Sequence, residues 1–358
     1  GIGIVATGDW TYPLWMREIK SKLIERGDGI LGLKKEYRDE ARKSGLVPSN
    51  VEPFFLLATE VSSIYVQGGK QRRVHNLIWS PTISAAEKIN AELGKRGCNL
   101  SSDGRPIVGL TSEEVAQIVF SIDETCIMIP AHAWTPWFSL FGSKSGFDTV
   151  EECSGKYANY IYAIETGLSS DPLMNWEIAN LDSRTILSFS DAHSGPKLGR
   201  EATVFNLQQL SYENIRSAIK NTNVQRLKTN DYIACTFEFY PGEGKYHYDG
   251  HRACNIRQTP EETRKRGMAC PVCGRPLTVG VMYRVKELSN RKIIPVYKKD
   301  KQGVRWVYHP KNIRPPFVNL VPLLEIIGEA LHVGTTSQKA QTVYDKITAE
   351  LRGEFNVL

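Results

Sequence analysis

Short apolar runs alternate with amphipathic stretches from Gly1 to about Val224. The runs are rich in Ile, Leu, Val and Phe, and apolar runs of this length predict buried strands. The stretches between them repeat apolar residues every three or four positions, which predicts helices with one buried face. The expected strands are 2–8, 54–61, 74–79, 126–131, 160–166 and 185–190, and the expected helices are 14–25, 83–95, 112–122 and 212–220. This alternation is typical of an α/β barrel.

The pattern changes after residue 230. One more strand is expected at 232–240, and a turn rich in Gly then leads into a segment rich in Cys and His. A basic connector follows, in which four prolines between residues 289 and 319 exclude a long helix. Two helices are expected at 320–331 and 337–351. We therefore predict a barrel domain at 1–228, a zinc-binding domain at 229–290, and a connector with a C-terminal helical region at 291–358.

Length, charge and cysteine usage narrow the class of protein. The 358 residues suit one barrel with a smaller appendage, and no apolar run approaches the roughly 20 residues that span a bilayer. Seven Cys without a framework spacing favour reduced thiols and therefore a cytoplasmic protein. The net charge of +6 permits a polyanionic partner without requiring one. Because the sequence opens inside an apolar run without an initiator Met, we expect it to be truncated.

Side chains that bind metals stand at or near the ends of five expected strands. They are Asp9, Glu60, His75, His132, Asp191 and His193. In an α/β barrel the C-terminal strand ends converge on one face, so these residues can meet around one set of ions. One such side chain alone is usually satisfied by a backbone group, but five strand ends together favour the metal centre of a hydrolase. A mixture of imidazoles and carboxylates suits Zn²⁺, Mn²⁺ or Fe²⁺ better than Mg²⁺ or Ca²⁺.

A second metal site is predicted from two close pairs of residues. The first pair is His251 and Cys254, and the second is Cys270 and Cys273 within CPVCG, where the final glycine lets the backbone turn toward sulfur. Three Cys and one His close a tetrahedral Zn²⁺ site and leave no position for a catalytic water, which favours a structural role. His247 lies in the same turn as His251 and competes with it as the fourth ligand.

Four longer motifs resemble the endonuclease Q family of the polymerase and histidinol phosphatase (PHP) superfamily. They are GDWTYPLW at 8–15, the stretch 130–148, ETGLSSDP at 165–172 and KYHYDGH at 245–251, and the resemblance runs from end to end. It implies a PHP-type distorted (β/α)7 barrel that holds two or three divalent metals (Zn²⁺, Mn²⁺ or Mg²⁺), a small zinc-binding domain and C-terminal helices. The family's opening His-x-His motif is absent, and Tyr12 stands where its motif commonly has His. We therefore expect a barrel that is incomplete at the N-terminus and a fragment with weak or no activity.

The resemblance also implies a function. The family comprises DNA-repair endonucleases that cut the phosphodiester on the 5′ side of deaminated bases such as uracil and hypoxanthine, and of abasic sites. The six predicted barrel ligands match metal-ligand positions of the superfamily, and we assign the catalytic roles to Asp191, His193 and Glu60. The expected partner is DNA that contains damaged bases. A monomer is expected, and a polymerase sliding clamp is a further candidate partner.

Several residues are candidates for DNA contact, since a damaged base must leave the duplex to be inspected. They are Trp134, Trp137 and Lys144 in the loop after residue 132, Glu165, Ser170, Asp171 and Asn175 around 165–175, and Arg200 after the last strand. The first group can stack on DNA, the second can line the pocket for the base, and the arginine can pair with a phosphate. The alternatives are aromatic packing, loop capping by Ser, Asp and Asn, and an arginine that only holds a loop.

Two other functions share part of these features. A PHP-type phosphoesterase for a small phosphomonoester would use the same metals but would need neither the zinc knuckle nor the basic connector at 291–314. A non-catalytic nucleic-acid-binding protein would keep the knuckle and the basic surface but would have no use for six metal ligands. We therefore expect an endodeoxyribonuclease.

Overall fold

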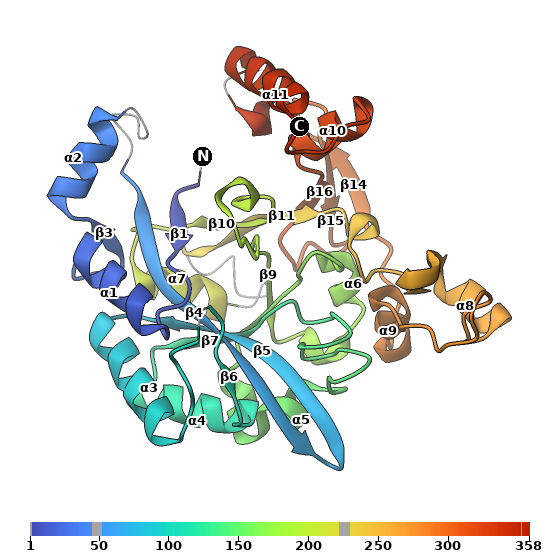
Figure 1. The fold of residues 1–358 in the computed structure, drawn as a ribbon, viewed down its shortest axis with the longest axis horizontal. Helices are drawn as coiled ribbons and strands as arrows, with labels where there is room; N and C mark the ends of the chain where they lie inside the picture. The colour runs from blue at the N-terminus through green and yellow to red at the C-terminus, as the bar shows by residue number, and fades with distance from the viewer. Residues whose placement is uncertain (1, 45–51, 103, 222–229, 352) are drawn as a thin grey trace.

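The computed structural model describes residues 2–44, 52–102, 104–221, 230–351 and 353–358. In this part of the chain, the strands form a seven-stranded sheet, a five-stranded sheet and two pairs of strands. The strands are β1 (Ile4–Ala6), β2 (Leu23–Glu25), β3 (Leu31–Leu33), β4 (Phe54–Gln67), β5 (Lys70–Ser80), β6 (Ile107–Val108), β7 (Ile127–Pro130), β8 (Ala163–Glu165), β9 (Thr185–Leu187), β10 (Ala202–Asn206), β11 (Tyr232–Phe239), β12 (Asp249–His251), β13 (Ile256–Gln258), β14 (Val296–Lys299), β15 (Arg305–Tyr308) and β16 (Phe317–Leu320). The helices, most of them on the outside of the sheets (Figure 1), are α1 (Pro13–Lys22), α2 (Lys35–Lys43), α3 (Ile83–Lys95), α4 (Ser112–Ile122), α5 (Val150–Ser154), α6 (Pro172–Trp176), α7 (Tyr212–Lys220), α8 (Pro260–Arg266), α9 (Val281–Leu288), α10 (Leu323–Ala330) and α11 (Gln338–Leu351).

A long antiparallel hairpin of β4 and β5 lies at the centre of the larger sheet. β4 pairs with β5 from Leu57 to Gln67. Gly68 and Gly69 form the turn with φ of 59° and 71°, the left-handed values that a type I′ turn requires. β7 lies antiparallel to β5, whereas β1 and β6 lie parallel to β4. The strand that was expected to end at residue 61 continues to Gln67. The parallel arrangement expected of a barrel is also wrong here, because the Gly68-Gly69 turn joins β4 and β5 into an antiparallel hairpin.

The larger sheet is covered on both faces. Alternate residues of β7 point into different cores, with Met128 in one and Ile127 and Ile129 in the other. Helices α3 and α4 pack in the first core and α7 packs in the second. These three helices have the predicted bounds, and each begins after a Thr or Ser side chain that caps its first turn. The predicted helices at 83–95, 112–122 and 212–220 are thereby confirmed, whereas the helix expected at 14–25 ends at Lys22 and strand β2 begins at Leu23.

The five-stranded sheet joins distant parts of the chain in the order β10-β11-β16-β15-β14. The connector, which was expected only to lack a long helix, supplies β14, β15 and β16. Arg314 ties it to the rest of the protein, since its guanidinium donates to the carbonyls of Leu181, Asp182 and Arg184. One sheet thus contains strands from all three predicted domains. The boundary at 228/229 lies outside the described residues, and the domain division stays a prediction.

Two smaller regions complete the molecule. β12, β13, α8 and α9 form the segment rich in Cys and His, which projects at the right of Figure 1. α10 and α11, close to the two predicted C-terminal helices, pack on each other through Leu323, Ile327 and Ala340. Among the described helices, none is both long and apolar enough to cross a membrane.

Candidate metal centres

Glu60, His75 and His132 bring their metal-binding atoms together on the larger sheet. These atoms all lie within 4.8 Å of one another. Nδ1 of His75 is 2.8 Å from Oε1 of Glu60, and Nε2 of His132 is 3.4 Å from the same oxygen. The two imidazole nitrogens are 3.1 Å apart. Three of the six predicted barrel ligands thus form one cluster with the donor types that suit a transition metal.

Glu60 and His75 come from the middle of their strands, not from strand ends as predicted. Glu60 lies opposite Leu77 and His75 lies opposite Ser62. The two ligands are therefore diagonal neighbours on one face of the hairpin, where side chains of this length meet. His132 lies two residues after the last residue of β7, close to a strand end as predicted. Antiparallel pairing, and not the convergence of parallel strand ends, places the first two ligands together.

The electrostatics of the cluster favour metal binding. Burial lowers the pKa of His75 to about 4, so its imidazole is neutral at neutral pH. Burial opposes the ionisation of Glu60, but hydrogen bonds from His132 and His75 outweigh it and hold the pKa well below its ordinary value. Burial also lowers the pKa of His132, yet the hydrogen bond and charge of Glu60, with the charges of Glu165 and Asp191, raise it overall. Metal ligands must be deprotonated, and His75 and Glu60 already are.

Three predicted ligands share a left-handed backbone conformation that is uncommon outside glycine. The φ angle is 42° at Asp9, 30° at His132 and 44° at Asp191. Strain of this kind collects where the surrounding structure must aim a functional side chain. Asp9 and Asp191 are outside the three-residue cluster, and they stay predicted ligands.

Glu165 holds His132 in its strained conformation. The His132 N–H donates to the Glu165 carboxylate, and the Ala133 N–H donates to the Glu165 carbonyl at 2.9 Å. A Cβ on Gly167 would lie 2.6 Å from the Cβ of His132, so only glycine fits there. Burial raises the pKa of Glu165 to about 7, and its Oε1 has no hydrogen-bond partner among the described residues. Glu165, predicted near the base pocket, is thus a support of the metal cluster.

The Asp191 loop is tied down by Arg200. The Arg200 guanidinium donates to the carbonyls of Ser190 at 2.9 Å and Asp191 at 3.4 Å. This arrangement matches the alternative in which the arginine holds a loop. The His193 side chain is 72% exposed, and its Nδ1 lies 2.9 Å from the Asp191 carbonyl oxygen. His193 stays a predicted ligand.

Arg105 is a residue of the site that the sequence pattern did not indicate. Its Nη1 lies 2.9 Å from Oε1 of Glu60. Arg105 stands between Gly104 and Pro106 in an irregular loop, so neither periodicity nor motif spacing marks it. Only the pairing of β6 with β4 brings this loop to Glu60.

Four of the residues predicted to contact DNA serve the interior. Trp134 is 1% exposed, stacks on Phe141, and donates from Nε1 to Asn175 at 2.7 Å. Ser170 and Asn175 are buried, and Asp171 caps α6 by accepting from the Met174 N–H. The prediction that Trp134 stacks on DNA does not fit its burial, and packing and capping account for all four.

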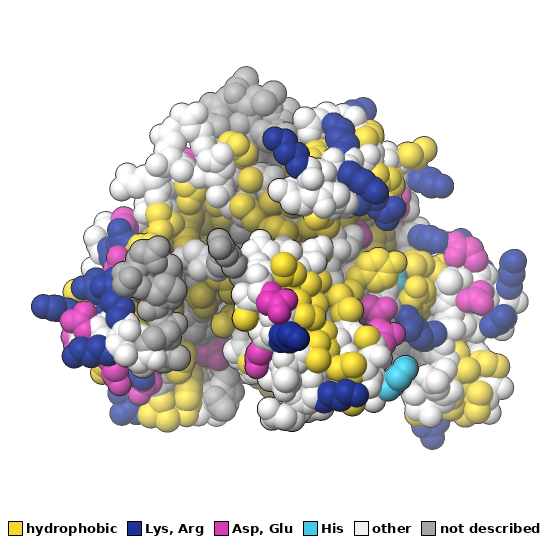
Figure 2. Space-filling view, turned by 90° about the horizontal axis from the view of Figure 1, so that it is seen from above, with side chains coloured by type: hydrophobic (Ala, Val, Ile, Leu, Met, Phe, Trp, Pro, Cys, Tyr) yellow, Lys and Arg dark blue, Asp and Glu magenta, His cyan; other side chains and the backbone are white. Residues whose placement is uncertain are grey.

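Trp137 and Lys144 remain candidates for DNA contact. Trp137 is half-buried with its ring edge toward Tyr246, and Lys144 is exposed. Figure 2 shows Lys and Arg side chains dispersed over one face of the molecule rather than gathered in a single patch. A surface for a polyanion on that face would consist of separate cations, which single substitutions can test.

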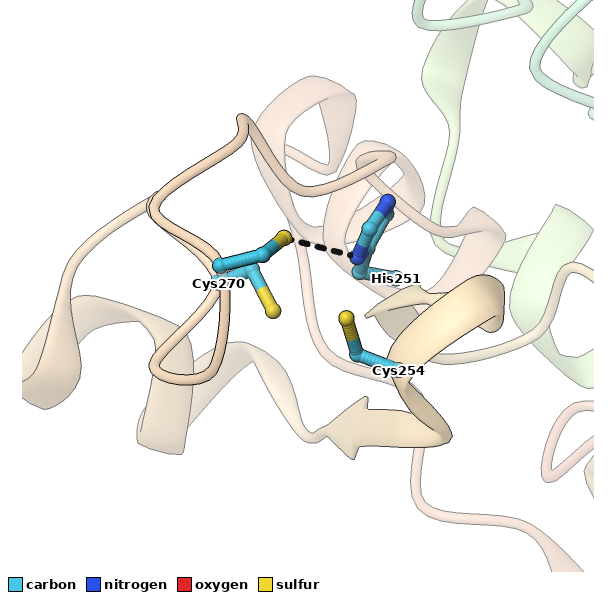
Figure 3. Close-up of side chains that lie close together, drawn as sticks. His251, Cys254 and Cys270 are labelled. Atoms are coloured by element: carbon cyan, nitrogen blue, oxygen red, sulfur yellow. Dashed lines mark hydrogen bonds between the residues drawn. The ribbon is translucent and has the colours of Figure 1, made fainter.

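The second cluster consists of His251, Cys254, Cys270 and Cys273, whose ligand atoms lie within 4.8 Å of one another. Figure 3 shows the first three side chains pointing toward a common centre. Sγ of Cys273 is 3.4 Å from Nδ1 of His251. Gly274, with φ of 74°, donates its N–H to the Cys270 carbonyl and closes the knuckle. The predicted quartet is thus grouped as a tetrahedral metal site requires.

The alternative ligand His247 is not part of the quartet that the described residues form. It is buried, and its Nδ1 lies 2.9 Å from the carbonyl oxygen of Ser169. Burial raises the pKa of the Cys270 thiol, but the backbone N–H groups of Cys273 and Val272 outweigh it and lower the pKa to about 6. Cys270 is therefore largely a thiolate at neutral pH, the state that binds zinc.

The fold and the two clusters define a mixed α/β protein with a carboxylate and imidazole centre and a separate Cys₃His centre. No protein-family model matches the sequence. The crystal structure of the lesion-specific endonuclease PfuEndoQ from Pyrococcus furiosus is 29% identical with a TM-score of 0.75, and the match covers 100% of this chain and 76% of that one. The crystal structure of endonuclease Q in complex with a 27-mer duplex that carries an abasic lesion is 30% identical with a TM-score of 0.77. That match covers 100% of this chain and 78% of the other chain. The chain belongs to the endonuclease Q family.

Two curated relatives are also similar over part of their length. An uncharacterized protein of Methanocaldococcus jannaschii is 31% identical over 234 residues, which are 63% of this chain and 26% of that protein. The uncharacterized protein YqxK of Bacillus subtilis is 28% identical over 260 residues, which are 71% of this chain and 58% of that protein. The chain thus spans about a quarter of the first relative and somewhat over half of the second.

Proposed function

We propose that this protein is a metal-dependent DNA-repair endonuclease that hydrolyses the phosphodiester on the 5′ side of uracil, hypoxanthine or an abasic site. The observation that carries the proposal is the match of the whole chain, at 30% identity, to an endonuclease Q bound to a duplex with an abasic lesion. The Glu60, His75 and His132 cluster supports it, because hydrolysis of a phosphodiester uses such a centre. The fold is proposed to be a PHP-type barrel at 1–228, followed by a zinc-binding domain at 229–290 and a connector with C-terminal helices.

The metal ligands are proposed to be Asp9, Glu60, His75, His132, Asp191 and His193. Two or three bound ions (Zn²⁺, Mn²⁺ or Mg²⁺) would supply an activated water and stabilise charge on the phosphate. Within the chain, neutral His75 and ionised Glu60 provide the cluster with ligands that need lose no proton. Glu165 keeps His132 aimed at Glu60.

The Cys₃His centre is proposed to hold a structural Zn²⁺, because three thiols and one imidazole fill a tetrahedral ion and leave no place for a substrate. DNA contact is proposed for Trp137 and Lys144. The exposed hairpin of β14 and β15 adds cations beside aromatic rings, since Lys298 lies over Tyr308 and Arg305 lies over Tyr297. A monomer, with a sliding clamp as partner, completes the proposal.

The test is cleavage of labelled duplexes that contain uracil, hypoxanthine or an abasic site, with Mn²⁺ or Mg²⁺ and with EDTA. We expect cuts on the 5′ side of the lesion that EDTA abolishes and that Asp191→Asn removes while DNA binding persists. A phosphomonoester is assayed in parallel. Hydrolysis of the monoester alone would favour a phosphoesterase, and lesion binding without any cut would favour a non-catalytic protein.

A further inference from the structure

Arg105 is held beside Glu60 by its backbone. β6 pairs in parallel with β4 at Ser62 and Ser63, and the Ser62 N–H donates to the Pro106 carbonyl at 2.9 Å. The residue before that proline is therefore fixed next to the strand that carries Glu60. The Glu60 side chain is 14% exposed and that of Arg105 is 32% exposed, so the guanidinium approaches Glu60 from the solvent side of the cluster.

Most of the Arg105 donors are unused. A guanidinium carries five N–H groups in one plane. Within the described residues, the Arg105 guanidinium makes one hydrogen bond, from Nη1 to Oε1 of Glu60. A permanent cation with free donors thus lies at the entrance of the carboxylate and imidazole cluster.

The oxygen that Arg105 contacts is heavily shared. Oε1 of Glu60 is 2.8 Å from Nδ1 of His75, 3.4 Å from Nε2 of His132 and 2.9 Å from Nη1 of Arg105. A divalent ion bound by these ligands would need the same lone pairs and would add positive charge beside the guanidinium. A guanidinium keeps its positive charge in proteins and cannot relieve that repulsion. An anion at the centre would relieve it.

We propose that Arg105 is a catalytic residue that binds the scissile phosphate. With ions present, its guanidinium turns from Glu60 to the non-bridging oxygens of the phosphodiester and stabilises the charge that grows during attack. The fork of N–H donors matches two phosphate oxygens, which a lysine ammonium cannot reproduce. The assignment rests on the proposed endonuclease function. A cluster that only binds metal ions would gain nothing from a neighbouring cation. A role in binding phosphate explains why Arg105 lies beside Glu60.

The experiment compares Arg105→Gln and Arg105→Lys with the wild type. Arg96→Gln is the matched control, because Arg96 also pairs with a glutamate, Glu92, at 3.4 Å but on an exposed helix end. In single-turnover cleavage of an abasic duplex, we expect Arg105→Gln to lose about 10²- to 10³-fold, as loss of one charge-stabilising donor does elsewhere. Arg105→Lys should keep more activity than Arg105→Gln, and Arg96→Gln should match the wild type.

Two readouts do not depend on cleavage. Mn²⁺ affinity, measured by calorimetry without DNA, should change less than about threefold in Arg105→Gln, whereas a residue that only positions Glu60 would lower it about tenfold or more. Inorganic phosphate binding to the Mn²⁺-loaded protein should weaken at least tenfold in Arg105→Gln. Phosphate binding that is independent of Arg105, or metal affinity that falls in step with cleavage, would overturn the assignment. A wild type that binds phosphate through Arg105 but cuts no lesion would contradict the endonuclease proposal and leave the anion site standing.

Discussion

The two candidate metal centres of this protein are built in opposite ways. In the Cys₃His centre, His251 and Cys273 are 22 residues apart, with His251 at the end of β12 and Cys273 in a short turn of the same small region. In the carboxylate and imidazole centre, His75 and His132 are 57 residues apart, and they meet only because three strands pair. One site is assembled by local chain geometry and the other by a sheet.

The difference predicts how each region depends on its ion. Val61, Val74 and Ile78, on the strands that carry Glu60 and His75, are fully buried in the main core. That part of the fold has a source of stability other than metal. The small region has few buried apolar residues around its cysteines, so its ion is expected to supply much of its folding free energy.

The strongest test of the comparison removes a predicted ligand from the carboxylate and imidazole centre. Glu60→Gln should lower lesion cleavage by at least about 10³-fold, because the cluster loses the carboxylate that both imidazoles share. Thermal unfolding should change little, since the sheet core remains. Glu87→Gln, at an exposed carboxylate paired with Lys20, is the control. Retained cleavage would remove Glu60 from the mechanism.

The matching change in the small region is Cys270→Ser. Structural zinc contributes about 10 kcal/mol or more to the folding of isolated zinc modules, so this variant should lose its zinc and unfold locally. Hydrogen exchange should become fast across 249–288 and stay slow in β4 and β5. Cys98→Ser, at a cysteine outside both clusters, serves as control. Slow exchange in a zinc-free variant would show that this region folds without the ion.

The two tryptophans of the loop after His132 should separate packing from DNA contact. Trp134→Ala should destabilise the protein by about 3–5 kcal/mol, because it empties a buried aromatic site. Trp137→Ala should leave stability within about 1 kcal/mol and weaken DNA binding, if its ring stacks on a base. Denaturant unfolding and fluorescence anisotropy measure the two effects. Equal loss of stability in both variants would place Trp137 in the core as well.

Glu165 should give the metal-free protein a measurable pH dependence. Its folded pKa of about 7 lies above the ordinary value of 4.5, so the folded state binds the proton more tightly than the unfolded state. The stabilisation is full below pH 4.5 and is lost as the pH rises through 7, by on the order of 3 kcal/mol. Glu165→Gln should remove this dependence, which is measured as the difference from wild type in urea unfolding with EDTA. Parallel pH curves would mean that the carboxyl titrates normally.

Lys144→Ala should have the smallest effect. Removal of one exposed cation that contacts DNA should change the slope of log affinity against log salt concentration by about one. DNA binding should weaken equally for damaged and intact duplexes. Its stability should match that of the wild type. Lys95→Ala, on the exposed end of α3, is the control. An unchanged salt slope would place the DNA path elsewhere.

Short-range sequence patterns were enough to predict the grouping of the Cys₃His quartet and the bounds of several helices. The quartet of His251, Cys254, Cys270 and Cys273 was predictable because tight turns and soft ligands at close spacing leave few other arrangements. The bounds of α3, α4 and α7 were predictable because apolar periodicity and capping residues act within one or two turns. The choice between His251 and His247 needed the structure, since the contact of His247 with Ser169 is distant in the chain.

The carboxylate and imidazole centre shows what local sequence patterns cannot predict. The sequence pattern indicates Glu60, His75 and His132, but converging strand ends do not bring Glu60 and His75 together, because the Gly68-Gly69 turn makes β4 and β5 a hairpin. No local sequence pattern indicates that Arg105 lies beside Glu60. The sequence also predicts an exposed Trp134, whereas the structure buries it. Strand pairing and burial are set by the free energy of the whole chain. Which residues face each other across a sheet is therefore decided only when the tertiary structure forms.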